Sequence, residues 1–400
     1  MAHPKPRFIL PLVLIVAAVP ALWGCSALDT PAATAEPSPQ SVPPTEPAPT
    51  EAPSEPLPFA VYFLSDTTGT MQLWRLERDA ITLTRLTDES TPVYEFEVSP
   101  ANGTLAYATA NQIYTIQPDG SGRTLLVDGG AVRVLDEYGF LEEFQRIGSL
   151  AWSPDGQTLA YGHEGVNFYS FQEGASRMVL PNITHDEAGN LTMSFHVYLP
   201  KLWSPDGSRL LVYHQAWETR RYRILDVASE QFAGLQPESF ACCTYSWSPD
   251  SATLWFASHS IGMVRPGLWQ YDLLSGIETV LVVSENANAS LNFIAFPLQV
   301  GSDLYHLFAT NTPGDYPDRM PFTLVRAPLT DINARTPLRP DTWVVTDLLW
   351  APDGSLALGI LPAEDVSMIE NPSGALVLIP MDGSPGITLT ATALAPAWGP

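Results

Sequence analysis

The sequence predicts an all-β fold built from repeated units of four antiparallel strands. Three observations predict it: a short turn phrase recurs, an apolar run follows each copy, and another apolar run follows at a regular distance. The close copies of the phrase are Trp152–Gly156, Trp203–Gly207, Trp247–Asp250 and Trp350–Gly354, with a weaker copy at Val98–Gly103. A repeat of this length with strand-like runs is typical of a propeller or another repeat array.

Each copy of the phrase predicts a β-hairpin. The residues that end in Trp form one strand, and Ser-Pro-Asp-Gly forms a tight turn, because Pro presets φ, Asp bonds to its own backbone and Gly accepts a positive φ. The following apolar run is the partner strand. A fourth strand follows the third, as at Thr84–Thr87 and Arg123–Leu126, and four strands make a propeller blade. The expected third strands are Leu73–Leu76, Ile113–Ile116, Phe168–Phe171, Tyr222–Leu225, Leu268–Tyr271, Leu324–Ala327 and Leu376–Ile379.

Two counts predict seven blades. One is the number of third strands, and the other counts the turn prolines once a degenerate copy at Ala295–Pro297 and a final half-copy at Ala397–Pro400 are included. Six blades is the alternative, in which the unit near Pro297 is an insertion. The first unit, Phe59–Phe63, lacks a first strand, and Ala395–Trp398 lacks a second. We therefore expect the C-terminal strand to pair with the N-terminal blade and close the ring.

The repeat resembles that of a known family. Trp-Ser-Pro-Asp-Gly, the Leu-Ala-Tyr-like strand after it and Thr84–Asp88 are similar to the TolB-type, or WD-like, propeller repeat. The resemblance covers residues 58–400 and implies the propeller fold. Repeats of this type occur in protein-binding scaffolds, in peptidase accessory domains and in lyases, so the resemblance does not imply one function.

The first residues predict a bacterial lipoprotein signal peptide over residues 1–24. Lys5 and Arg7 precede an apolar stretch, Phe8–Trp23, that is too short for a membrane span. Leu22–Cys25 resembles a lipobox, in which the Cys25 thiol receives a diacylglyceryl group. Trp23 departs from the small residue that is usual there. The alternative is an ordinary secretory signal that is cleaved nearby.

Residues 25–57 predict a lipid anchor followed by a disordered Pro/Thr/Glu-rich tether. Positions 26–57 hold nine prolines and no aromatic residue, so this segment cannot form a core. In polyproline form the tether would reach about 100 Å. We expect an extracytoplasmic protein, periplasmic or at the cell surface, that contacts the bacterial membrane through its lipid alone.

The charge of the chain is strongly negative, at −24. Loss of Lys5 and Arg7 with the signal would leave 17 basic against 43 acidic residues. This charge excludes nucleic acid as a partner, since phosphates require Lys and Arg, and it excludes a head that lies on anionic lipid. A basic partner is favoured.

Three cysteines are present in the chain. Besides Cys25 they are Cys242 and Cys243, which are adjacent. Neighbouring cysteines form either a strained vicinal disulfide in an oxidising compartment or two thiols on opposite faces of a strand. No CxxC motif or nearby histidine cluster accompanies them, so we expect no metal there.

No motif in the sequence names a reaction. GxSxG, HExxH, P-loop and GxGxxG patterns in a suitable context are missing, so we expect no catalytic residue, no cofactor and no enzyme activity. His163, His214 and His259 end the second strands of three consecutive units. Second strands lie away from the axis, so these histidines are expected to be too far apart to share one metal ion.

A candidate binding face lies opposite the Pro-Asp-Gly turns. It comprises the loops after the three histidines and two long inserts, at residues 131–148 and 183–199. Loops on a rigid scaffold carry function more often than the scaffold does, and aromatic anchors in a charged rim suit a protein interface. The candidate residues are Tyr138, Phe140, Glu142, Glu143, Phe144, His163, Asp186, Glu187, His214 and His259.

The sequence thus predicts a monomeric, lipid-anchored scaffold that binds an envelope protein or peptide. The alternatives are a lyase or glycosidase that acts on a polysaccharide, and a protein that binds or senses a small solute. Convergence of acidic or histidine side chains at the centre of the ring would discriminate between these functions.

If Cys25 carries the lipid, Cys25→Ser should release the protein from membranes and abolish labelling by a fatty-acid analogue, because the tether and head have no other means of membrane attachment. Fractionation of cells that express either form measures this. Unchanged membrane retention of the variant would contradict lipidation.

Overall fold

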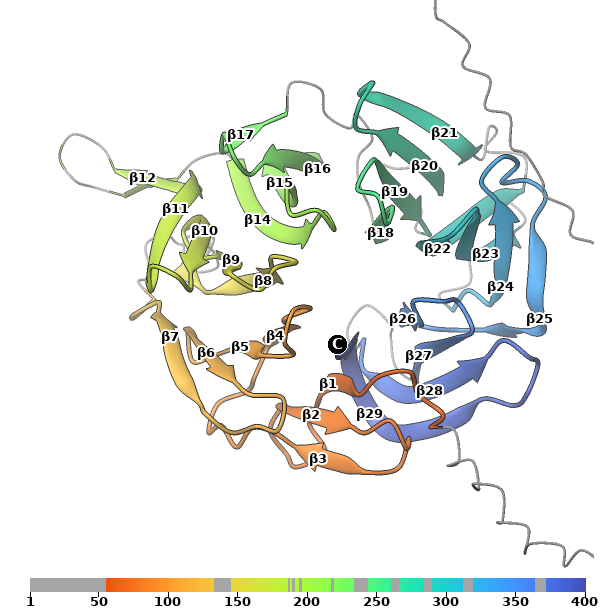
Figure 1. Cartoon of the computed structure of the whole chain (residues 1–400), viewed down its shortest axis with the longest axis horizontal. Coiled ribbons are helices and arrows are strands. Elements are labelled where there is room, and N and C mark those ends of the chain that lie inside the picture. The colour runs from red at the N-terminus through yellow and green to blue at the C-terminus, as the bar shows by residue number, and fades with distance from the viewer. Residues whose placement is uncertain are drawn as a thin grey trace, which may run out of the picture. The chain divides into compact units, whose positions relative to one another are not determined.

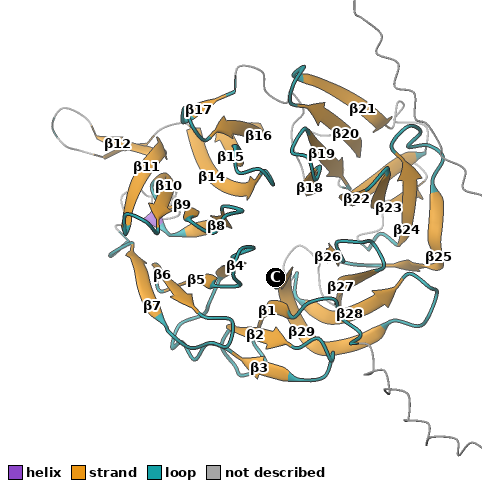
Figure 2. Cartoon of the chain, in the orientation of Figure 1, coloured by secondary structure: helices purple, strands orange, loops and turns teal. Residues whose placement is uncertain are grey.

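The computed structural model describes residues 55–132, 145–185, 188, 191–193, 196–216, 219–233, 244–259, 266–283, 290–311, 319–363 and 372–400. The chain divides into two compact units, Met1–Pro53 and Ser54–Pro400, and the described residues all lie in the second. This unit is all-β (Figure 2). No helix among the described residues is long and apolar enough to cross a membrane.

Five sheets have four antiparallel strands each, arranged in chain order from the centre outward. Figure 1 shows these sheets standing around a common centre, with β4, β8, β14, β18 and β22 innermost. The strands are β4 Glu95–Val98, β5 Leu105–Thr109, β6 Gln112–Ile116 and β7 Thr124–Asp128; β8 Gly148–Trp152, β9 Thr158–Gly162, β10 Gly165–Ser170 and β11 Ala175–Pro181; β14 His196–Trp203, β15 Arg209–Ala216, β16 Thr219–Asp226 and β17 Gln231–Phe232; β18 Thr244–Trp247, β19 Thr253–Ser258, β20 Gly267–Asp272 and β21 Ile277–Val283; β22 Leu291–Val300, β23 Asp303–Asn311, β24 Phe322–Pro328 and β25 Thr336–Trp343.

A sixth sheet joins the two ends of the described chain. Its seven strands run in the order β26-β27-β28-β29-β1-β2-β3. The long strand β29 pairs with β28 through its first half and with β1 through its second, where Val61 lies opposite Trp398. This is the pairing that the incomplete repeats at the two ends predict. The strands are β26 Asp347–Trp350, β27 Leu356–Pro362, β28 Gly374–Pro380, β29 Ile387–Trp398, β1 Val61–Ser65, β2 Gln72–Leu76 and β3 Leu83–Arg85; a two-stranded sheet adds β12 Ile183–His185 and β13 Leu191–Met193.

The seven expected third strands all lie within strands of the structure, in β2, β6, β10, β16, β20, β24 and β28 apart from an occasional terminal residue. The degenerate copy at Ala295–Pro297 lies in β22, which is the inner strand of its sheet. A β-bulge interrupts the pairing of β22 there, and Phe296 takes a positive φ of 51°. The prediction that Ala295–Pro297 is a copy of the turn was therefore wrong, because β22 and β23 stay paired as far as Val300 and Asp303 and their turn lies beyond Pro297. Similar register shifts occur in β8 and β14, so the bulge is a recurring feature of the inner strands.

The turn phrase folds as its chemistry predicts. The Ser153 hydroxyl donates to Asp155 Oδ1 at 2.6 Å, and the backbone N–H groups of Gln157 and Thr158 donate to the Asp155 carboxylate and the Ser153 hydroxyl. Gly156 has φ +66°, and a Cβ there would lie 2.9 Å from the Cβ of Ala101 in the neighbouring turn. The turns of consecutive sheets are therefore in contact, and only glycine fits that approach.

The Trp of the phrase joins each sheet to the one before it. The indole N–H of Trp203 donates to the carbonyl of Ala151 on β8 at 3.0 Å, and Trp152 donates to Glu97 on β4 at 3.3 Å. The same bond recurs from Trp247 to Leu202, from Trp350 to Phe296 and from Trp398 to Trp350. Each indole also packs in an apolar cluster, such as that of Trp203 with Phe168 and Leu210. The repeated Trp is thus a structural residue that bonds neighbouring inner strands.

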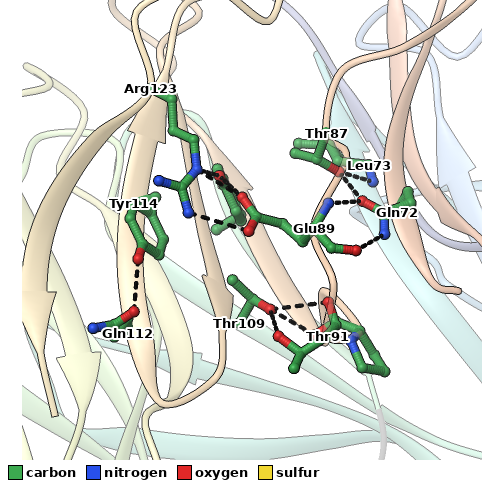
Figure 3. Close-up of polar contacts among 11 residues, drawn as sticks. Gln72, Leu73, Thr87, Glu89, Thr91, Thr109, Gln112, Tyr114 and Arg123 are labelled. Carbon is green, nitrogen blue, oxygen red and sulfur yellow. Dashed lines mark hydrogen bonds and ion pairs between the residues drawn. The ribbon is translucent and has the colours of Figure 1, made fainter. Parts of the chain in front are cut away.

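A separate polar network fixes the connection between β3 and β4 (Figure 3). The Thr87 hydroxyl donates to Gln72 Oε1 at 2.8 Å, and the backbone N–H of Glu89 donates to the same oxygen at 3.0 Å. The Glu89 carboxylate accepts from Arg123 Nε at 2.7 Å and from the Tyr107 hydroxyl at 2.6 Å. The network links β2 with β5 and with the residue before β7, so it holds two neighbouring sheets together. Its role is structural.

Replacing Trp203 by Phe should lower the free energy of unfolding by about 1–3 kcal/mol more than replacing Trp74 by Phe. The first change leaves the buried carbonyl of Ala151 without its partner, whereas the Trp74 indole N–H has no hydrogen-bond partner to lose. Denaturant titration of both variants measures the difference. Equal losses would mean that ring packing alone holds the sheets together.

Candidate functional site

Charged side chains occupy β4, the inner strand of the β4–β7 sheet. Along β4, Phe96 and Val98 are buried in the core that this sheet shares with β1 and β2, while Glu95 and Glu97 lie on the opposite face and are half-buried. This alternation follows from the two-residue period of a strand. β4 is an innermost strand (Figure 1), so Glu95 and Glu97 both belong to the inner edge of the ring.

Groups from three further sheets interact with these carboxyl groups. Glu95 accepts a backbone hydrogen bond from Leu150 on β8 and interacts electrostatically with Lys201 on β14. Tyr245 on β18 experiences the negative charge of both Glu97 and Glu95. Lys201 occupies a bulge in β14, where the pairing with β15 shifts between Pro200 and Leu202. We call Glu95, Glu97, Lys201 and Tyr245 the axial cluster.

The ionisable groups of the axial cluster have shifted pKa values. Burial raises the pKa of Glu97 to about 8, and the charge of Glu95 acts in the same direction. Burial also raises the pKa of Glu95, although Lys201 and the Leu150 backbone oppose that rise. Burial lowers the pKa of Lys201, with Glu95 opposing. At pH 7 Glu97 is mainly a neutral acid, which can donate a hydrogen bond as well as accept one.

Two polar groups in this region are unpartnered. Among the described residues, none forms a hydrogen bond with the Glu97 carboxyl group. The hydroxyl of Ser246, next to Tyr245 on β18, is buried and also has no partner within the described chain. Most buried polar groups in proteins are paired, so the buried Ser246 hydroxyl lies where a ligand could complete it, whereas the half-buried Glu97 carboxyl group also reaches solvent.

Two other enclosed ionisable groups lie outside the cluster. Burial raises the pKa of Asp347 on β26 to about 6, and its carboxylate accepts from the backbone N–H of Leu348. Burial lowers the pKa of His306 on β23 to about 4. The charge of Arg335 is the one further charge that acts on His306, so neither group is coupled to Glu95 or Glu97.

The structure places the three predicted histidines in three different sheets. His163 follows β9, His214 lies in β15, and His259 follows β19. His214 Nε2 lies 2.8 Å from His196 Nδ1, and the His214 ring stacks on Tyr198. Burial lowers the pKa of His259, whose ring stacks on Phe296. Each histidine therefore has its own local partners, and no group of three His, Cys, Asp or Glu in the described ranges could hold a metal ion.

The remaining residues of the candidate binding face lie outside the described residues, as do the lipidation site and the cysteine pair. They are Tyr138, Phe140, Glu142, Glu143, Phe144, Asp186, Glu187, Cys25, Cys242 and Cys243. The functions predicted for them stay predictions.

Sequence reasoning missed the axial cluster, although a signal was present. Glu95, Glu97 and Lys201 lie one to three residues before the Trp position of the phrase, in strands predicted to be innermost. Charged residues are rarely enclosed in a fold without a specific reason. Combining the repeat with its position-specific charges would have found the cluster, whereas a search for contiguous catalytic motifs could not.

Comparisons with known proteins agree on the fold. Residues 61–171 match the family model of the dipeptidyl peptidase IV (DPP IV) N-terminal region, which is under a third of the chain. No curated protein matches the chain. Among solved structures, an oligogalacturonate lyase in complex with manganese is 12% identical, with 82% of this chain and 84% of that chain covered and a TM-score of 0.53. The fold is that of a TolB-like β-propeller.

Two further structures are similar at lower scores. TolB from Acinetobacter baumannii is 15% identical over 85% of this chain and 82% of that chain, with a TM-score of 0.42. Porphyromonas gingivalis dipeptidyl peptidase 4 is 11% identical over 77% of this chain and 46% of that chain, with a TM-score of 0.46. At these identities the likeness concerns the fold alone.

The expectation that the chain is not an enzyme was wrong. It rested on missing sequence motifs, yet the similar structures include an oligogalacturonate lyase. A propeller brings residues from several blades to one centre, so an active site on this fold has no contiguous signature. The missing motifs therefore do not exclude catalysis.

The free energy of unfolding should fall as pH rises from about 5 to 8, by about 1–3 kcal/mol from Glu97. The folded state binds the Glu97 proton more tightly than the unfolded state does, so that stabilisation is lost as pH rises through the folded pKa of about 8. Denaturant titrations across this range should show a smaller pH dependence for Glu97→Gln than for wild type. The control variant Asp66→Asn, at an exposed site, should show the same pH dependence as wild type. Identical profiles for wild type and Glu97→Gln would contradict the raised pKa.

Proposed function

We propose that the protein is a lipid-anchored, extracytoplasmic β-propeller that binds a protein or peptide of the cell envelope at the axial cluster. One observation carries the proposal: Glu95, Glu97, Lys201 and Tyr245 come from three different sheets and are electrostatically coupled at the inner strands. Strongly shifted pKa values at a place that several elements enclose are typical of functional sites.

The ring around the cluster has seven blades in this proposal. The seven-stranded sheet is understood as two blades that share β29, because its two halves pair with different strands. Five four-stranded sheets complete the count. Seven clusters of buried apolar side chains, each between neighbouring sets of strands, support it. A closed ring has no exposed inner edge and holds its central groups rigidly.

Enclosing charged groups at the centre is costly for folding. A carboxyl group removed from water without hydrogen bonds destabilises the native state by several kcal/mol, and Glu97 responds by remaining protonated. An apolar residue of similar size would avoid that cost. The presence of Glu95, Glu97 and Lys201 on inner strands therefore favours a function for them over a packing role.

The proposed location follows from the predicted segments, and the proposed partner follows from the net charge. A signal, Cys25 and a proline-rich tether would place the propeller outside the cytoplasm at a membrane surface. The net charge of −24 favours a basic partner and gives an association rate that falls with salt. A single chain is sufficient for the site, because all of its groups come from one propeller.

Acid–base catalysis on a polysaccharide is the second candidate function. The observation that favours it is a carboxyl group protonated near pH 7 beside a second carboxyl group, together with a lysine of lowered pKa. Glycosidases need one protonated and one ionised carboxyl group, and lyases need a base of suitable pKa.

A photo-cross-linking side chain at Tyr245 should capture an envelope protein or peptide, because Tyr245 belongs to the axial cluster. The same group at Met178, on the exposed face of β11, is the matched control and should capture much less. Adding Glu95→Gln and Glu97→Gln should reduce capture from position 245. Mass spectrometry of the cross-linked species gives the readout.

Equal capture from both positions, or capture unaffected by the two Gln substitutions, would contradict binding at the axis. Shortening of an envelope polysaccharide by wild type, lost in Glu97→Gln, would instead support the catalytic candidate. Chromatography of polysaccharide digests measures that activity.

A further inference from the structure

A second site lies between the β8–β11 sheet and the β14–β17 sheet, away from the axial cluster. A cavity of about 570 Å³ opens where the turns at residues 153–156 and 204–207 face each other. Its volume is in the range of pockets that hold small ligands or a few side chains. Phe168 on β10 and Trp203 on β14 line it, with their ring centroids 5.3 Å apart. We call this cavity the turn-side groove.

A difference in side-chain size at one repeated position explains why the groove is open. The backbone N–H of Phe171 donates to Gln157, and that of Val227 donates to Ser208 in the next sheet, so Phe171 and Val227 hold equivalent positions. The Phe171 ring stacks on Trp152 with centroids 4.9 Å apart. The smaller Val227 side chain lines the cavity at this position, and Trp203 beside it is as deeply buried as Trp152, at 6% exposed. The space that phenylalanine fills in one sheet is therefore empty in the next.

The rim of the groove is negatively charged. Asp155, Glu173 and Asp206 are exposed there. The Ser153 hydroxyl holds the pKa of Asp155 below its ordinary value. Burial tends to raise the pKa of Asp206, but hydrogen bonds from serine hydroxyls and a backbone N–H outweigh it. Both aspartates are therefore ionised at neutral pH.

The one cation that lines the groove is already compensated. Arg177 forms an ion pair with Glu230 and lies over the Phe168 ring, 5.4 Å from its centroid. Since this positive charge is balanced, the three rim carboxylates leave the groove with a net negative charge. An anionic ligand is disfavoured, and a ligand that combines an apolar group with a cation is favoured.

We propose that the turn-side groove binds a peptide segment of another protein in which an apolar side chain adjoins a Lys or Arg. The apolar side chain contacts Phe168, Trp203 and Val227, and the basic group lies against Asp155 and Asp206. This site is independent of the axial cluster and lies at the opposite end of the blades from the face that the sequence singled out.

Two other occupants are disfavoured by charge. The proline-rich segment at residues 26–57 carries five acidic residues and no Lys or Arg, so the rim repels it. A second copy of this chain has the same net charge of −24 and is repelled for the same reason. A basic partner is the occupant that the rim attracts.

The test uses the mature full-length protein and the dipeptide acetyl-Phe-Lys-amide, with acetyl-Phe-Glu-amide as the charge control. Binding is measured by calorimetry and by the NMR shift of the Trp203 indole N–H. We expect acetyl-Phe-Lys-amide to bind and to shift the Trp203 signal, and acetyl-Phe-Glu-amide to bind at least tenfold more weakly. Val227→Phe should weaken binding at least tenfold by filling the groove, as Phe171 does in the preceding sheet.

Leu273→Phe is the matched control, because the Leu273 backbone N–H donates to Ala252 in the equivalent bond of the next sheet, outside the groove. This variant should bind like wild type. Asp155→Asn with Asp206→Asn should weaken binding about threefold to tenfold and reduce its salt dependence. Failure of axial cross-linking leaves these expectations unchanged, since no axial residue is involved.

Equal binding of the two dipeptides, or no shift of the Trp203 signal in wild type at millimolar peptide, would overturn the proposal. Unchanged affinity of Val227→Phe would also overturn it. If that variant fails to fold, the wild-type Trp203 shift and the aspartate variants still decide the outcome.

Discussion

The indole N–H that donates to a carbonyl of the preceding inner strand is the interaction on which the rest of the structure depends. The strands of one sheet form their backbone hydrogen bonds with each other, so these bonds do not fix a sheet to its neighbour. The bonds from Trp152, Trp203, Trp247, Trp350 and Trp398 do this at the inner edge, where the sheets are closest. Each contributes about 1 kcal/mol net, and the apolar ring adds more by burial. Between β22 and β18 the backbone N–H of Phe296 donates to the Thr244 hydroxyl.

A rigid inner ring explains how charged groups can be retained at the centre. If the inner strands could move apart, water would enter and the carboxyl groups of Glu95 and Glu97 would ionise as they do in solution. Their raised pKa values require that the neighbouring strands stay in place. The structural bond from Trp152 ends on the carbonyl of Glu97 itself. The same residue thus receives a bond that holds the ring together and presents a carboxyl group to its centre.

Much of the fold could be predicted from the sequence, because turn chemistry and strand periodicity act over a few residues. The hairpins, the third strands and the pairing of the C-terminal strand all depend on such local signals. The double use of β29 could not be predicted, since Ile387–Ala393 reads as an outer strand and Leu394–Trp398 as an inner one. The axial cluster was missed for another reason. Its members lie in three sheets, at residues 95–97, 201 and 245, and only the ring brings them together.

Departures from the repeat mark the places where this chain differs from a generic propeller. Each regular position of the repeat packs against neighbouring sheets, and this packing limits the residues that fit there. A change at one of them is retained only where stability elsewhere tolerates it. Lys201 in a bulge and Glu97 on an inner strand are changes of this kind. Both place an ionisable group where packing alone would favour an apolar one, so neither improves the packing. The function proposed above for the axial cluster would account for both.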